Sequence, residues 1–135
     1  MYNAAVLFTQ RQSRVKADHI ERLLEILKRK NIKARHYFFN GDYYTAKKIL
    51  TSIEGIDKLL IFDFSELNIS FEKKLFLLKV ALKKQISIEE FSSDSSIFDI
   101  NGNIDYSTVI QFLIDSKNNG RKILKFIKQQ MKNAA

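Results

Sequence analysis

Short apolar runs alternate with segments of helical periodicity along the chain, and this alternation constrains the fold more than any other feature of the sequence. Apolar runs lie at residues 3–9 and 58–64, and two further segments typical of strands lie at residues 32–39 and 86–91, the last alternating apolar and polar residues. Each is followed by a segment whose apolar residues recur every three or four positions, at residues 20–30, 43–53, 70–85 and 106–133. Strands joined in this way through helices run parallel, because each helix returns the chain to the same end of the sheet. The sequence therefore predicts an α/β fold, a flavodoxin-like parallel sheet in three layers that ends in a long C-terminal helix.

Length and composition agree with one domain. The 135 residues are 45% hydrophobic and 28% charged, which is typical of a globular protein. We expect one domain over residues 1–135, with an α/β core at 1–104 and a C-terminal helical segment at 105–135. No apolar run reaches the roughly 18 residues of a membrane helix, and no basic segment precedes the first run. These features favour a cytoplasmic protein without a membrane partner.

The residue types present narrow the chemistry. The chain has no cysteine and two histidines, which excludes disulfides and thiolate sites and argues against a metal centre. We therefore expect no metal and no cofactor. His19 and His36 are each expected to have a structural role. Asp63 and Glu66 follow the third apolar run and could pair on a metal ion, but a solvated loop is the favoured interpretation.

The charge favours a polyanionic partner such as nucleic acid. Lys and Arg number 23 against 15 acidic residues, for a net charge of +8. Residues 116–135 carry +6 of this charge and residues 1–115 only +2. The alternative is a solvated lysine surface. The residues expected to contact DNA phosphates, weakly and without sequence preference, are Arg14, Arg121, Lys122, Lys125, Lys128 and Lys132.

The loop after the first apolar run offers a candidate nucleophile. In a parallel sheet, function gathers at the carboxyl ends of the strands, where this loop is expected to lie. Ser13 stands between Arg11 and Arg14. A serine hydroxyl beside cations can attack a phosphodiester, because the cations stabilise the charge that develops. The alternative is that Ser13 caps the helix that follows.

From this loop onward the chain resembles a known family. Arg11-Gln12-Ser13 follows the apolar run at residues 5–8, and the apolar run at residues 59–64 leads into Ser65-Glu66-Leu67-Asn68-Ile69. This order is similar to the N-terminal catalytic domain of the serine recombinases, the resolvase and invertase group. That domain has Tyr-x-Arg-x-Ser after its first strand and Asp-Arg-Leu-x-Arg in mid-chain. The resemblance implies a resolvase-like fold, DNA recombination in a mobile element, and Ser13 and Arg11 as catalytic residues.

The chain departs from the family motifs at the charged positions. If Phe8 takes the place of the motif tyrosine, Gln10 takes the place of the arginine, and Ser13 matches only after a one-residue slip. Glu66 and Ile69 stand where the mid-chain arginines are expected. Those arginines would neutralise a phosphate, and a glutamate repels it. We therefore predict a catalytically inactive, DNA-associated dimerisation or regulatory module.

The terminal segment completes the resemblance. In the family, the corresponding long helix dimerises and leads onto DNA. Here the apolar residues that would form the dimer face are Val109, Ile110, Leu113, Leu124 and Ile127. We expect a homodimer, or association with an active recombinase. The alternative is a helix that closes the core.

Two other functions stay open. One is an active recombinase that uses Ser13 with Arg11, Arg14 and Arg121 facing the phosphate. The other is a flavodoxin-like domain of unrelated function.

Overall fold

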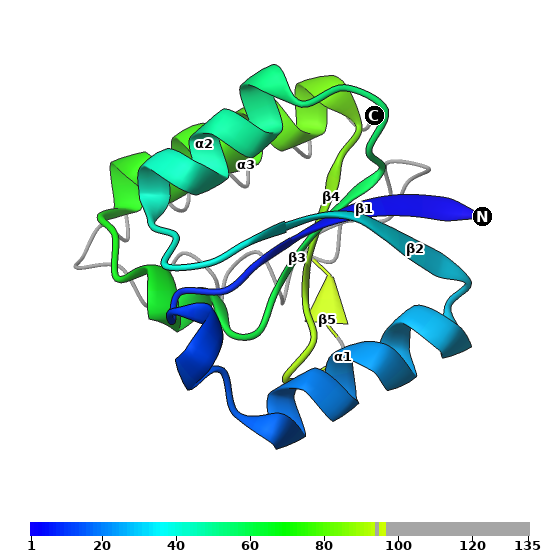
Figure 1. Cartoon of the computed structure of the whole chain (residues 1–135). Coiled ribbons are helices and arrows are strands. Elements are labelled where there is room, and N and C mark those ends of the chain that lie inside the picture. The colour runs from blue at the N-terminus through cyan, green and yellow to red at the C-terminus, as the bar shows by residue number, and fades with distance from the viewer. Residues whose placement is uncertain (94, 97–135) are drawn as a thin grey trace.

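The chain folds around a mostly parallel sheet, seen edge-on between helices in Figure 1. The computed structural model describes residues 1–93, 95 and 96. Its sheet has the order β2-β1-β3-β4-β5. The strands are β1 (Tyr2–Leu7), β2 (Ile32–Phe38), β3 (Lys58–Ile61), β4 (Ser87–Glu90) and β5 (Ser95–Ser96). The first four pair in parallel, and β5 adds an antiparallel edge.

The helices cover both faces of this sheet and give three layers. They are α1 (Ala17–Arg29), α2 (Tyr43–Ser52) and α3 (Phe71–Lys84), with short 3₁₀ turns η1 (Gln12–Arg14) and η2 (Phe64–Leu67). α2 and α3 lie side by side on one face, and α1 lies on the opposite face (Figure 1). This confirms the predicted α/β fold with a parallel sheet. The predicted helical segment at 105–135 lies outside the described residues.

The apolar core divides into two clusters, one on each side of the sheet, because successive strand residues point to opposite faces. Ala5 and Leu7 of β1 pack toward α2 and α3, where Ile49 and Leu78 are also buried. Ala4 and Val6 point the other way. On that side they pack with Phe8, Leu23, Ile26, Ile32, Leu60 and Phe91. β1 is therefore buried on both faces, as its unbroken apolar run predicts.

Local sequence determines where the helices begin and end. Asp42 and Thr45 form a reciprocal capping box at the start of α2, with Thr45 N donating to Asp42 Oδ1 at 3.1 Å. The Ser70 side chain caps α3. α1 begins after Lys16 with no side-chain cap, so the suggestion that Ser13 caps this helix is wrong. Asn31, just after α1, has a φ of 56° and ends the helix in the left-handed region.

Three details differ from the expectations. β3 ends at Ile61 rather than at residue 64, because Asp63 accepts hydrogen bonds from Ser65 and starts η2. A lysine in a helix of this periodicity is expected off the apolar line, yet Lys74 is 1% exposed. β5 falls in a stretch expected to be a loop. None of the described helices has the length and apolar character needed to cross a membrane.

Candidate functional site at the carboxyl ends of the strands

The loops after β1 and β2 are joined by backbone hydrogen bonds. Asn40 N donates to Gln10 O at 2.7 Å, and Gly41 N donates to Phe8 O at 3.0 Å. Glycine suits this position, because a Cβ on Gly41 would lie 2.2 Å from Leu7 Cδ1, and the buried Leu7 side chain would have to shift. The loop that contains the candidate nucleophile is thus fixed at its base to the neighbouring strand end.

A side-chain hydrogen bond links the β1 loop to the loop after β3. Gln10 Nε2 donates to Glu66 Oε2 at 2.8 Å, and both side chains are half-buried. Glu66 lies in η2, immediately after the strand that pairs with β1. In the expected match to the family motifs, the two positions that would carry arginines are held together here as an amide and a carboxylate. The contact brings one negative charge and no positive charge to the site.

Other carboxylates at these strand ends hold the loops in place. Asp63 Oδ1 accepts from the backbone N and the Oγ of Ser65, at 2.9 and 2.7 Å. Glu90, the last residue of β4, accepts from Phe64 N at 3.0 Å. Across the described residues, no group of three or more His, Asp or Glu side chains is arranged to hold a metal ion. The role these carboxylates show is to fix backbone donors.

Ser13 lies in η1 and is exposed, between the exposed Arg11 and Arg14. Within the described part of the chain its hydroxyl makes no hydrogen bond. The turn is closed by its backbone, with Arg14 N donating to Arg11 O at 2.9 Å. The structure places these three sequence-predicted residues together on one turn. The other candidates, from Val109 to Lys132, lie outside the described residues.

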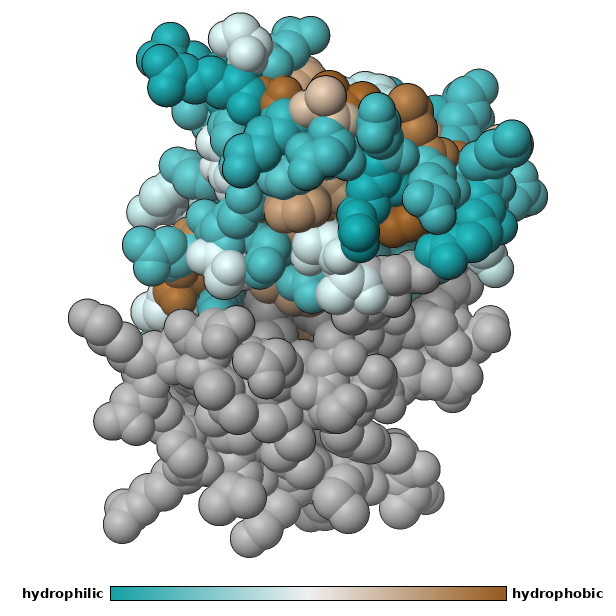
Figure 2. Space-filling view, turned by 90° about the horizontal axis from the view of Figure 1, so that it is seen from below, coloured by the Kyte–Doolittle hydropathy of each residue, from teal (hydrophilic) through white to brown (hydrophobic). Residues whose placement is uncertain are grey.

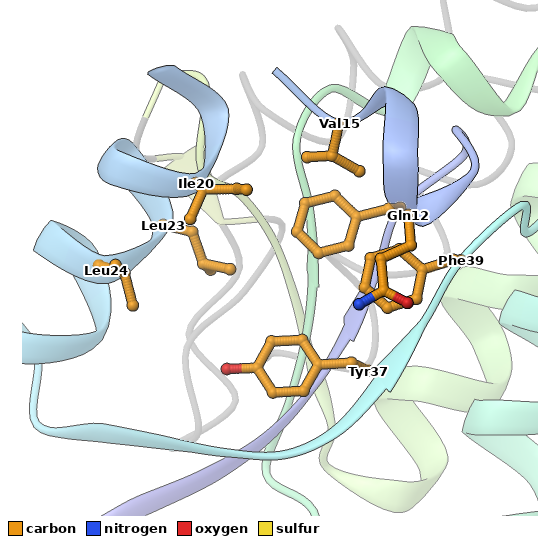
Figure 3. Close-up of a pocket in the computed structure, with 8 residues that line it drawn as sticks. Gln12, Val15, Ile20, Leu23, Leu24, Tyr37 and Phe39 are labelled. Carbon is orange, nitrogen blue, oxygen red and sulfur yellow. The ribbon is translucent and has the colours of Figure 1, made fainter. Parts of the chain in front are cut away.

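Behind η1 an apolar pocket of about 160 Å³ opens between α1 and β2 (Figure 3). Its lining is mostly aliphatic and aromatic: Phe8, Gln12, Val15, Ile20, Leu23, Leu24, Tyr37 and Phe39. Phe8 stacks on Phe39 with ring centroids 5.2 Å apart. Phe8, the residue expected to take the place of the motif tyrosine, is 3% exposed. This position therefore supplies packing and has no hydroxyl. The pocket has no charged lining and does not suit a phosphate.

The α1 side carries a second, polar hollow of about 420 Å³. Arg22 crosses it and donates to Ser92 O at 2.5 Å. His19 stacks on Phe62 with centroids 3.6 Å apart, and its Nδ1 is buried without a hydrogen bond in the described part of the chain. Seen from this side, the described surface is mainly hydrophilic, with apolar side chains showing between polar ones (Figure 2). His36 is exposed on β2.

Comparisons with known proteins identify the fold. No protein-family model matches the sequence, and no curated protein matches it. The structure is similar to the crystal structure of the N-terminal catalytic domain of TP901-1 integrase, a serine recombinase, with a TM-score of 0.57. The match covers 94% of this chain and 98% of that chain. The chain has the serine-recombinase catalytic fold.

This resolvase-like fold confirms the resemblance expected from the sequence. The identity over the match is 13%, so the likeness concerns the fold and leaves the activity to the site residues. Sequence reasoning singled out Glu66, through its place in the motif. It missed the contact between Glu66 and Gln10, because the two residues are 56 positions apart and no local pattern links them.

Proposed function

We propose that this resolvase-like domain is a catalytically inactive, DNA-associated dimerisation or regulatory module. The hydrogen bond between Gln10 and Glu66 carries the proposal. A site that cleaves a phosphodiester has to stabilise the negative charge that develops on phosphate, and removing one such donor typically slows catalysis by about 10²- to 10³-fold. Here an amide and a carboxylate occupy the place of two cations. The carboxylate repels a phosphate group electrostatically.

The proposed partners are DNA and a second recombinase-like chain. The net charge of +8 favours a polyanion, and lysine-rich contacts attract phosphates without reading bases. Arg14 and the basic residues from Arg121 to Lys132 are the proposed contacts. The dimer would form through the apolar residues from Val109 to Ile127, with a second copy or with an active recombinase.

An active recombinase is the second candidate, and one observation favours it. Ser13 is exposed beside Arg11 and Arg14, so its hydroxyl is open to a DNA backbone. This turn lies next to Gln10, which is bound to Glu66. For Ser13 to attack a phosphate whose charge is neutralised, a cation from another loop would first have to displace the contact between Gln10 and Glu66.

A covalent-adduct assay separates the two candidates. The full chain is incubated with supercoiled plasmid and with labelled nicked duplexes of random central sequence, and protein–DNA adducts are then sought in denaturing gels. We expect no adduct from the wild type or from Ser13→Ala. An adduct that maps to Ser13 and disappears in Ser13→Ala would establish the active alternative. Replacing Glu66 and Ile69 with arginine is expected not to restore cleavage, because the first loop is also displaced by one residue.

A gain of affinity tests the site itself. The double variant Gln10→Arg with Glu66→Arg adds three positive charges at the strand ends, and we expect it to bind duplex DNA more tightly. The matched control, Glu25→Arg with His36→Arg, adds the same charge on exposed positions of α1 and β2. If both variants gain affinity equally, the strand ends are not a phosphate-facing site and the proposal loses its main support.

A further inference from the structure

The lysines of the described chain are concentrated on one side of the sheet. α2 and α3 contain seven lysines and one glutamate, a net charge of +6, whereas α1 is neutral. Both basic helices lie on the same face of the sheet (Figure 1). The exposed members of this set are Lys47, Lys48, Lys73, Lys79, Lys83 and Lys84. The positive potential of this layer is independent of the terminal segment.

Three lysines join α2 and α3 in order along their length. Lys73 Nζ lies 5.0 Å from the ring centroid of Tyr43 and 5.5 Å from that of Tyr44. Lys47 Nζ lies 5.4 Å from the ring centroid of Phe76. Lys84 Nζ donates to Thr51 O at 2.7 Å. We call this line the α2–α3 seam and define it by Tyr44, Lys47, Thr51, Lys73, Phe76 and Lys84. At the helical rise it spans about 16 Å from Lys73 to Lys84.

Two aromatic rings on the seam are open to solvent. Tyr44 is 66% exposed and Phe76 is 39% exposed. Single exposed apolar residues are common on proteins, but these two flank lysines on one line between two helices. Burial, and to a smaller extent the neighbouring Tyr44, raises the pKa of Tyr43 above 10.0, so this tyrosine carries no negative charge at neutral pH. The seam therefore combines ammonium groups with two solvent-exposed aromatic side chains.

We propose that the α2–α3 seam binds single-stranded DNA, with its lysines along the phosphates and its two exposed rings against the bases. Aromatic rings stack on bases whose faces are open, and a positive groove follows the backbone. A duplex hides its base faces in the stack, so the exposed rings of the seam favour a single strand over a duplex. The choice of DNA over RNA rests on the proposed function. The choice of a single strand rests on the exposed rings.

Fluorescence anisotropy of the full chain with a labelled oligo(dT) of about 15 nucleotides tests the seam. Tyr44→Ala is expected to weaken binding about tenfold, and Tyr44→Phe to retain it, because the ring is kept. Tyr37→Ala is the matched control, since Tyr37 is 49% exposed on β2, away from the seam. If Tyr44→Ala and Tyr37→Ala bind equally well, no base stacks on the seam and the proposal is wrong.

The charge component has its own readout. Lys47→Gln with Lys73→Gln is expected to reduce the slope of log affinity against log salt by about 1.4, because each lost phosphate contact on a single strand contributes about 0.7. Lys28→Gln with Lys33→Gln, two exposed lysines off the seam, is expected to leave the slope unchanged. An equal fall in both double variants would mean diffuse attraction and would overturn the seam as a site.

Further variants and ligands distinguish a failure of the seam proposal from a failure of the proposed function. Lys122→Glu with Lys125→Glu and Lys128→Glu is expected to abolish duplex binding and to leave part of the oligo(dT) binding. If this terminal variant loses all oligo(dT) binding while seam variants lose none, the seam proposal fails and the DNA association stands. If the wild type does not bind duplex DNA while the seam still binds oligo(dT), the proposed duplex association fails and the seam proposal stands. Tighter binding of oligo(rU) than of oligo(dT) would contradict the choice of DNA.

Discussion

Glu66 determines the character of the strand-end site more than any other single residue. It lies half-buried in η2 and accepts a hydrogen bond from the Gln10 amide. Its importance could be predicted from its place in the motif. Its partner could not, because the contact exists only once β1 and β3 pair in parallel. For Ser13, the sequence left two roles open, a nucleophile and a helix cap. The structure excludes the second, because α1 begins with no side-chain cap.

Breaking this contact is expected to cost stability. Glu66→Ala should lower the free energy of unfolding by about 1 kcal/mol, because a hydrogen bond to a charged group is lost at a half-buried position. Urea denaturation measures the change. Glu54→Ala, at an exposed position, is the control and should stay within about 0.5 kcal/mol of wild type. A double-mutant cycle with Gln10→Ala checks the pairing, and strict additivity would contradict it.

At the scale of elements, the alternating pattern predicted the order of strands and helices, and the ends of most of them lie close to the expected positions. The errors have physical causes. β3 is shorter than its apolar run because Asp63 turns the chain into η2. Lys74 is buried because it lies on the face of α3 that also buries Leu77, Leu78 and Ala81. A two-residue strand such as β5 has no periodicity to detect.

One buried carboxylate joins three elements that the pattern treats separately. Glu89 of β4 pairs with Lys58 of β3 and, at 3.2 Å, with Lys30 at the end of α1. The side chains of Glu89 and Lys58 are 5% and 10% exposed, and that of Lys30 is 32% exposed. The sheet and α1 are therefore tied by a network in which Glu89 is the shared partner.

Removing Glu89 should therefore cost more than removing Lys30. Glu89→Ala is expected to lower the free energy of unfolding by about 3 kcal/mol, because it leaves Lys58 buried without a counter-charge. Lys30→Ala should cost about 1 kcal/mol or less, since the pair between Lys58 and Glu89 remains. Denaturation curves of the two variants give the ranking. Equal losses would show that the network does not depend on the buried pair.

At the scale of the whole molecule, the charge lies unevenly. Residues 1–115 have a net charge of only +2, although α2 and α3 are strongly basic. The sum is small because the acidic residues lie largely outside these two helices. The three-layer architecture was predictable because strand-like and helical segments alternate along the chain, so that each helix returns the chain to the same end of the sheet. The side of the sheet that carries most lysines could not be predicted, because it depends on which helices cover the same face of the sheet.

Self-association is expected at this scale. If the apolar residues from Val109 to Ile127 form a dimer face, sedimentation at micromolar concentration should give twice the monomer mass of 15.8 kDa. Leu113→Glu with Leu124→Glu should then return the chain to the monomer mass while the circular dichroism of the α/β core is kept. A wild-type mass equal to that of the monomer at this concentration would favour a helix that packs on its own core.

The edge strand β2 limits how two copies can meet. Its pairing with β1 slips by one residue at Arg35, and Lys33, Arg35, His36 and Tyr37 are exposed along it. An irregular register and charged side chains keep an open sheet edge from pairing with the edge of another sheet and so from forming fibres. A concentrated solution of this protein should therefore not polymerise through β2.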